Sequence, residues 1–313
     1  MTQLLRPITF ESSCSSPHLL ITGAVHGDEF EPILAIHRLV DHFRQANKQN
    51  AILRGRLTFV PIVNESAFLR GHRCADDGLD LARTCPGRSN GTITEQIAAE
   101  LSELIRSANF YIDLHTGGTE LCVLPLSGYM MHPDHEVLDA QRAMARAFNL
   151  PLIWGTAANL DGRSLSVARD ANVPAIYCEY QGSAVCDPAG VNAYVEGCLN
   201  VMRWLRIIDR PQPESVVRVV TENPQPDSGH MQICNPSPVD GYFEPAVKLG
   251  DIVAAGDSLG TIYPLNGDER QTVVSSQTGI VIVLRTFPRV RQGESVGVVM
   301  ETANDSHSFA PSR

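Results

Sequence analysis

Two patterns of apolar and polar residues, one typical of strands and one typical of helices, alternate along the first two-thirds of this 313-residue chain. Short apolar runs of strand length recur between segments whose apolar side chains return at helical spacing. The expected strands are 18–25, 57–63, 109–114, 121–126, 152–154 and 175–180. The expected helices are about 29–46, 94–107, 134–148, 164–171 and 189–207. This alternation predicts an α/β domain with a largely parallel or mixed sheet, covered by helices on both faces.

The first two expected helices have the clearest apolar spacing. The positions that carry it are Ile33, Leu34, Ile36, His37, Val40 and Phe43, then Ile97, Leu101, Leu104 and Ile105. The segment from Thr94 to Ile97 offers a side-chain cap, so the second helix is expected to begin there.

The pattern changes after residue 208. Residues 209–214 are polar and contain two prolines, as is typical of a joint between domains. Beyond them, short β-rich pieces alternate with glycines and show no helical period; they are 216–220, 241–243, 252–254, 258–263, 273–274, 279–284 and 295–300. We therefore predict an α/β domain over 1–208, a linker over 209–215 and an all-β domain over 216–301. Residues 302–313 are expected to form a flexible tail.

Part of the second domain resembles the sandwich of lipoyl and biotin carrier domains, from Gly241 through Asp257. Such carriers modify a lysine at a turn tip, and this segment has none there. Lys248 precedes Leu249-Gly250 and is interpreted as a surface residue, which argues against a carrier function.

Composition narrows the class of protein. Hydrophobic residues make up 43% and charged residues 19%, which fits a globular protein. The net charge of -10, with no basic run, disfavours nucleic acid as a partner. The sequence shows no signal peptide pattern and no apolar run of membrane-spanning length. Eight cysteines occur without a CxxC pair, so reduced thiols and a cytoplasmic location are expected.

Three side chains at strand ends form a candidate metal site. His26 and Glu29 follow the strand at 18–25, and His115 ends the strand at 109–114. Ligands gather at the carboxyl ends of strands in open α/β sheets. Two imidazoles and one carboxylate are a donor set that catalytic zinc accepts, because one coordination position remains open for water. A chain with ten histidines can contain an HxxE pair by chance, but the single pair here falls at a strand end.

A hydrolytic metal site also needs a base and positive charge. Glu179 lies in an otherwise apolar run of strand length, where a carboxylate is either part of a site or paired inside the protein. Burial would raise its pKa toward the working range of a general base. The loop 64–83 is rich in arginines that could stabilise an oxyanion or bind a substrate carboxylate. A single loop arginine is more often a solvated surface residue.

Together these motifs resemble the succinylglutamate desuccinylase/aspartoacylase family, whose members are relatives of the zinc carboxypeptidases. The resemblance covers His26-Gly27-Asp28-Glu29, the arginine-rich loop, Asp113-Leu114-His115-Thr116-Gly117 and the late Glu179, over roughly residues 18–208. It implies a carboxypeptidase-like mixed sheet flanked by helices, followed by a smaller all-β domain.

The resemblance also implies roles for individual residues. One zinc ion per chain would be held by His26, Glu29 and His115. Glu179 would activate the water molecule. Arg73 would stabilise the oxyanion, and Arg83 would bind a substrate carboxylate.

The chain departs from the family near the substrate. The family pattern Asp-Leu-Asn-Arg-x-Phe-Pro-Gly here reads Asp80-Leu81-Ala82-Arg83-Thr84-Cys85-Pro86-Gly87. Ala82 lacks the amide that normally assists the arginine, and Cys85 replaces an aromatic residue. Aspartate or glutamate derivatives should therefore not be assumed as substrates.

Further polar residues have two interpretations each. Asp113 lies on the same strand face as His115, so it either orients that ligand or makes a structural hydrogen bond. The segment 132–136 could suggest a second metal site, but its Pro-Asp pair favours a helix start. His72 either lines the pocket or faces solvent.

The expected activity is hydrolysis of the amide bond of a small N-acylated amino acid or amine, with a small molecule as partner. A homo-oligomer is compatible with the sequence. Two alternatives are a zinc carboxypeptidase acting on peptides and a non-catalytic zinc- or ligand-binding protein on the same fold. A base at Glu179 argues against a pure binding protein.

Overall fold

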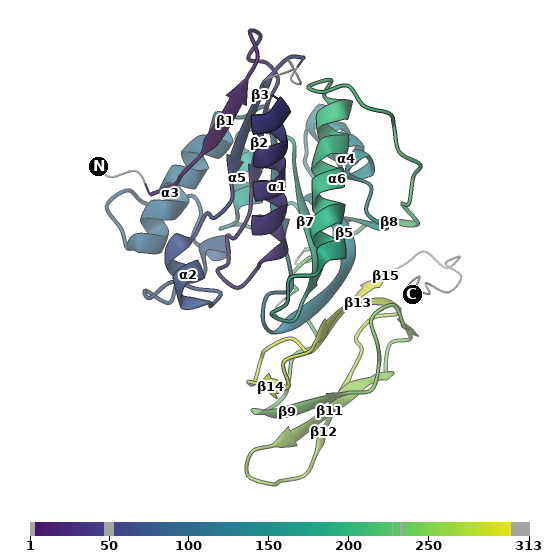
Figure 1. The fold of residues 1–313 in the computed structure, drawn as a ribbon. Coiled ribbons are helices and arrows are strands. Elements are labelled where there is room, and N and C mark those ends of the chain that lie inside the picture. The colour runs from purple at the N-terminus through teal and green to yellow at the C-terminus, as the bar shows by residue number, and fades with distance from the viewer. Residues whose placement is uncertain (1–3, 47–52, 227, 232–233, 302–313) are drawn as a thin grey trace.

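The computed structural model describes residues 4–46, 53–226, 228–231 and 234–301, so the expected tail over 302–313 lies outside the described residues (Figure 1). The helices are α1 (Glu31–Ala46), α2 (Glu65–Arg70), α3 (Ile93–Arg106), α4 (His135–Phe148), α5 (Ser164–Asp170) and α6 (Pro188–Trp204), with a 3-10 turn η2 (Leu81–Arg83). The first strands are β1 (Ile8–Glu11), β2 (His18–Thr22), β3 (Arg56–Val60), β4 (Phe110–His115), β5 (Leu121–Met130), β6 (Leu152–Thr156), β7 (Ala175–Gly182) and β8 (Val219–Glu222). The later ones are β9 (Gly241–Pro245), β10 (Ile252–Val253), β11 (Ser258–Pro264), β12 (Gln271–Val274), β13 (Gly279–Arg285), β14 (Arg289–Val290) and β15 (Gly297–Glu301).

An 11-stranded mixed sheet forms the centre of the molecule, with the main strand order β1-β3-β2-β4-β7-β5-β13-β10. The strands β3, β2, β4 and β7 are parallel neighbours, and β5 runs antiparallel to β7. Because β2, β4 and β7 point the same way, the segments that follow them meet at one edge of the sheet. The predicted α/β class with a mixed sheet is therefore confirmed.

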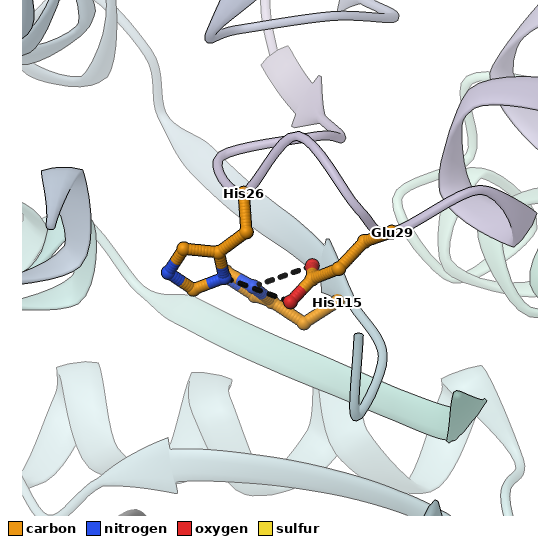
Figure 2. A group of neighbouring side chains, drawn as sticks. All are labelled: His26, Glu29 and His115. Atoms are coloured by element: carbon orange, nitrogen blue, oxygen red, sulfur yellow. Dashed lines mark hydrogen bonds and ion pairs between the residues drawn. The ribbon is translucent and has the colours of Figure 1, made fainter. Parts of the chain in front are cut away.

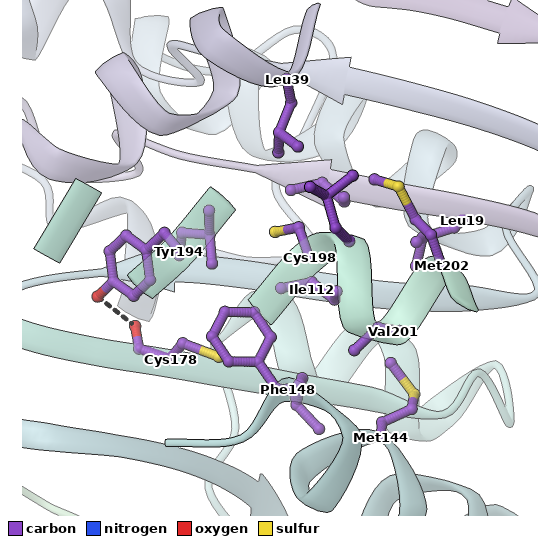
Figure 3. Close-up of a cluster of buried hydrophobic side chains, with 14 of the residues drawn as sticks. Leu19, Leu39, Ile112, Met144, Phe148, Cys178, Tyr194, Cys198, Val201 and Met202 are labelled. Atoms are coloured by element: carbon purple, nitrogen blue, oxygen red, sulfur yellow. Dashed lines mark hydrogen bonds between the residues drawn. The ribbon is translucent and has the colours of Figure 1, made fainter. Parts of the chain in front are cut away.

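Helices cover both faces of this sheet because its strands alternate apolar side chains between the two sides. Leu19 and Ile21 of β2 belong to the core cluster under α1, α4 and α6, whereas Leu20 packs with the cluster under α3 and α5. Figure 3 shows the first cluster, where Tyr194 and Cys198 of α6 lie against the sheet. Strands buried on both faces account for the continuous apolar runs in the sequence.

Each expected strand and helix of the first 208 residues has a counterpart, with some differences. The strand β1 and the six-residue helix α2 were not expected, since both are too short for a clear period. Helix α3 begins at Ile93, before the expected Thr94, because Thr92 forms a capping box with Glu95.

The apolar stripe on α1 is narrower than its spacing predicts. Ile36 and Val40 are buried, whereas Leu34 is 40% exposed and His37 faces solvent. Helical spacing alone does not show how wide a face the neighbouring α6 covers.

The C-terminal region is β-rich, and its smaller antiparallel sheet has the order β12-β11-β9-β14. Figure 1 shows this sheet projecting beyond the helical layers. The strand β13 belongs to the large sheet through β5, and its side chains alternate between two cores: Ile280 and Ile282 face one, and Val281 faces the other. The small sheet is therefore attached through a strand of the large one.

Besides β13, which pairs with β5, a second strand of the expected all-β domain has a partner in the first domain. The strand β8 pairs in parallel with β6. The domain boundaries at 208, 215 and 301 stay a prediction. Among the helices of the described segments, none is long and apolar enough to cross a membrane.

Candidate metal and catalytic site

The three predicted metal donors lie together at the edge where β2 and β4 end. His26 and Glu29 occupy the turn between β2 and α1, and His115 is the last residue of β4. The His26 Nδ1 atom lies 2.7 Å from Glu29 Oε1, and His115 Nδ1 lies 3.1 Å from Glu29 Oε2. Figure 2 shows both rings directed at the carboxylate. Pairing of two strand ends thus joins residues that are 86 positions apart.

A carboxylate holds the far nitrogen of each imidazole. Asp80 Oδ1 lies 3.1 Å from His26 Nε2, and Asp113 Oδ2 lies 3.1 Å from His115 Nε2. Asp113 is fully buried and also accepts hydrogen bonds from Thr22 and Ser164. Carboxylates behind imidazoles fix ring orientation and raise ligand basicity at metal sites. The structure therefore brings Asp113 into the position of an orienting residue.

The donor atoms fit a small divalent cation. One nitrogen or oxygen from each residue lies within 4.8 Å of the others, and within the described residues this is the only such group of His, Cys, Asp or Glu. Bonds of about 2.0–2.1 Å from zinc to nitrogen imply donor separations of about 3.4 Å in a tetrahedral site. Burial favours the neutral form of Glu29, but His26 and His115 outweigh it and lower its pKa to about 2. An ionised carboxylate between two imidazoles is a suitable set for a metal.

Close packing explains the glycine inside the donor turn. A Cβ atom at Gly27 would lie 2.0 Å from the backbone carbon of Ala67 in α2. A side chain at this position would therefore push the turn away from α2 and move His26 and Glu29 together.

Glu179 lies beside the donors on the neighbouring strand. It pairs with His115 in the register of β7 against β4, and its side chain is 5% exposed. Its Oε2 atom has no hydrogen-bond partner within the described ranges. Burial, opposed by the attraction of His115, raises the pKa of Glu179 to about 8. The group is thus a buried carboxyl with an uncommitted oxygen next to the donors.

Arg73 is joined to the donor set through Asp80. The Nε and Nη2 atoms of Arg73 donate to Asp80 Oδ2 at 3.1 and 3.0 Å, while the other oxygen of Asp80 contacts His26. The sequence interpretation did not assign a role to Asp80. Its signal was its place in the Asp-Leu-x-Arg motif, but its contact with a histidine 54 residues away depends on the fold.

The departures from the family pattern also lie in or beside this site. Arg83 and Ala82 both line the pocket that contains His26 and Glu179. Cys85 is buried, and burial raises the pKa of its thiol to about 12, so it is a protonated packing residue. Ala82, which stands where the family has an asparagine, therefore lines the pocket. Cys85, which stands where the family has an aromatic residue, lies in the core.

A third arginine, absent from the sequence interpretation, lines the same pocket. Arg163 precedes α5, and its Nε and Nη2 atoms are buried without a hydrogen-bond partner in the part of the chain that the structure describes. Burial and the nearby Arg83 lower its pKa to about 10. The pocket holds about 560 Å³ of empty space including its mouth. Met130, Leu165 and Met231 add apolar surface to it.

Two candidates lie elsewhere. His72 is exposed, its Nδ1 atom accepts a hydrogen bond from the Cys74 amide, and it does not line this pocket. Asp134 caps α4 by accepting from the amides of Glu136 and Val137, so the segment 132–136 is a helix start.

An open α/β sheet with this donor set at its strand ends, and a buried glutamate beside it, is typical of metal-dependent hydrolases. Residues 15–205 match the Succinylglutamate desuccinylase/Aspartoacylase catalytic domain, and the chain belongs to this family. The resemblance expected from the motifs is confirmed.

The similarity to known proteins extends over almost the whole chain. The N-alpha-acetyl-L-2,4-diaminobutyric acid deacetylase of Halomonas elongata is 28% identical, over 94% of this chain and 85% of its own length. The product-bound structure of the ectoine utilization protein EutE (DoeB) from Ruegeria pomeroyi is 28% identical, with a TM-score of 0.81 over 94% of this chain and 87% of that one. A succinylglutamate desuccinylase/aspartoacylase from Rhodobacter sphaeroides shares the fold, with a TM-score of 0.82 and 24% identity over 96% of this chain and 90% of that one.

Proposed function

We propose that this chain is a zinc-dependent deacylase that hydrolyses the amide bond of a small N-acylated amino acid. The observation that carries the proposal is the position of Glu179, which adjoins His115 on the next strand and lines one pocket with His26 and Arg73. A protein that only bound a metal would not need a buried carboxyl with an uncommitted oxygen there.

The chain's own residues divide the reaction between them. A zinc ion at His26, Glu29 and His115 would polarise the acyl carbonyl and acidify a water molecule. Glu179 takes the proton of that water and passes it to the leaving amine. Arg73, held by Asp80, lies in the pocket as a cation for the oxyanion.

The substrate class follows from the other side of the pocket. Arg83 and Arg163 lie there, and two nitrogen atoms of Arg163 have no hydrogen-bond partner among the described residues. A guanidinium binds a carboxylate with two parallel hydrogen bonds, so the free carboxylate of an amino acid suits these residues. The deacetylase of Halomonas elongata supports an N-acetyl group as the acyl part.

The test is the substitution Glu179→Gln, which keeps size and hydrogen bonding but removes the base. We expect turnover of N-acetyl amino acids to fall by about 10²- to 10⁴-fold while one zinc per chain is retained. Native turnover in this variant would exclude Glu179 as the base. A substrate panel of N-acyl amino acids and peptides measures the class, and a preference for peptides would favour a carboxypeptidase instead.

A further inference from the structure

The loop between β4 and β5, residues 116–120, adjoins His115 and contacts the turn that holds His26 and Glu29. It follows His115 directly. The Thr119 amide donates to Asp28 Oδ2 at 2.8 Å, and Asp28 lies between the other two donors in the chain. The Gly117 amide donates to the Gln181 carbonyl at 2.8 Å, two residues after Glu179. The position of this loop therefore affects the spacing between His115 and the turn that holds His26 and Glu29.

Close packing leaves the loop little freedom to adjust. A Cβ atom at Gly117 would lie 2.2 Å from the carbonyl oxygen of Leu121, and one at Gly118 would lie 2.8 Å from Asp28 Oδ2. The Gly118 carbonyl also accepts from the Ala184 amide at 3.0 Å. The loop is thus packed directly against the donor turn at one end and against the segment after β7 at the other.

The end of the loop is attached to the C-terminal β region through Glu120. Its carboxylate contacts Arg285 Nη2 at 3.2 Å and Arg289 Nη2 at 2.5 Å. Its carbonyl accepts from the amides of Thr286 and Phe287 at 3.0 and 3.2 Å. Side chain and backbone of one residue therefore join the loop to the segment that follows β13.

Arg285 is a rigid partner for this attachment. It is 3% exposed, and its remaining donors contact the carbonyls of Ser295 and Arg289 and the carboxylate of Glu294. A buried guanidinium with all three nitrogens engaged is held in one position, and Glu294 still balances its charge when Glu120 is removed. Glu120 is thus held by a group that cannot follow it if it moves.

We propose that the Glu120–Arg285 ion pair positions the donor set, so that zinc affinity depends on the C-terminal β region. Neither residue lines the pocket, so both are positioning residues that act through loop 116–120. The inference rests on the proposed function only in taking zinc as the ion held by the three donors.

A second ion pair in the chain supplies a matched control. Arg142 of α4 and Glu222 of β8 are joined by contacts of 2.7 and 2.8 Å, which also tie the first 208 residues to the later chain. Neither residue contacts loop 116–120 or lines the pocket with the donors. Glu222→Gln therefore reports the cost of losing such a pair without a change at the donor set.

The experiment compares Glu120→Gln, Arg285→Lys and Glu222→Gln in the full chain. Zinc dissociation constants come from competition with a chromophoric chelator, and thermal unfolding of the metal-free protein measures stability. We expect Glu120→Gln to weaken zinc binding about tenfold, the lower end of the range for groups behind metal ligands. Arg285→Lys keeps the charge opposite Glu120 and should therefore weaken zinc binding less than Glu120→Gln does. In Glu222→Gln, zinc affinity should stay within about twofold of the native value.

Hydrogen exchange of the Gly117, Thr119 and Leu121 amides gives a readout independent of metal. Faster exchange in Glu120→Gln than in Glu222→Gln supports the proposal. If Glu120→Gln fails to fold, Arg289→Gln removes one contact of the same carboxylate and takes its place. Equal zinc affinity in all variants, at reduced stability, would overturn the proposal.

The two proposals can fail separately. Zinc binding that depends on Glu120, in a protein without deacylase activity, contradicts only the proposed function. A native chain that binds no zinc contradicts both.

Discussion

The three candidate metal donors differ from the substrate side of the pocket in how far the protein satisfies its own polar groups, although Glu179 Oε2 beside the donors also has no partner among the described residues. On the metal side, both nitrogens of His26 and His115 and both oxygens of Glu29 have partners. On the substrate side, two nitrogens of Arg163 are buried without any. Buried polar groups left unpaired cost free energy, so such groups point to a partner that arrives with the ligand.

This difference separates chemistry from specificity. The metal side is arranged by contacts within the chain, and its donors match those expected for the family. Ala82, which differs from the asparagine of the family pattern, lies on the substrate side. A residue that contacts only the ligand can change without disturbing the donors. A family fold can therefore keep its reaction while its substrate changes.

The largest loss of zinc affinity should follow from a substitution of Glu29, the donor that contacts both imidazoles. Glu29→Gln removes the charge shared by His26 and His115. We expect zinc affinity to fall by more than about 100-fold, because even groups behind the ligands cost about 10- to 100-fold. Deacylation should be lost in parallel. Isothermal titration with zinc measures the first effect, and an unchanged affinity would show that the metal does not bind at Glu29.

A smaller loss is expected when only the orientation of a donor is disturbed. Asp113→Asn keeps the shape of the residue but weakens its hold on His115, and zinc affinity should fall by about 10- to 100-fold. The control is Asp139→Asn, an exposed residue on α4 whose change should leave the affinity as it is. If the two variants behave alike, Asp113 makes only a structural hydrogen bond.

On the substrate side, removal of a guanidinium should affect binding and leave the metal alone. Arg163→Met loses charge-assisted hydrogen bonds worth about 1.5–3 kcal/mol, so KM should rise roughly 10- to 100-fold. Steady-state kinetics with zinc-loaded protein measures it. A fall in kcat with unchanged KM would instead place Arg163 at the oxyanion.

The smallest effect should come from restoring the family residue at Ala82. Ala82→Asn adds an amide beside Arg83, and one neutral hydrogen bond contributes about 0.5–1.5 kcal/mol. For substrates with a second carboxylate, KM should therefore fall roughly two- to tenfold, with zinc affinity unchanged. A higher KM for every substrate would mean that the native ligand fills the space left by Ala82.

Much of the first 208 residues could be predicted because the signals are local. Apolar runs and helical spacing located its longer strands and helices, and the position of His26 and Glu29 after a buried run indicated two of the three candidate donors. Elements of four to six residues are too short to show a regular spacing of apolar residues, so β1 and α2 were missed. The cap of α3 was placed two residues late, because the contact of Glu95 with Thr92 begins before the apolar spacing does.

By itself, the sequence determined the α/β class and the family, and it predicted the donor residues and Glu179, because each depends on periodicity or on a motif within a few residues. Only the tertiary structure placed Arg163 in the pocket with two nitrogens that have no partner among the described residues. It also brought Asp80 to His26, paired β8 with β6 and attached Glu120 to Arg285. Those contacts join segments from 54 to 165 residues apart. They depend on how remote elements pack against one another, which local side-chain patterns do not record.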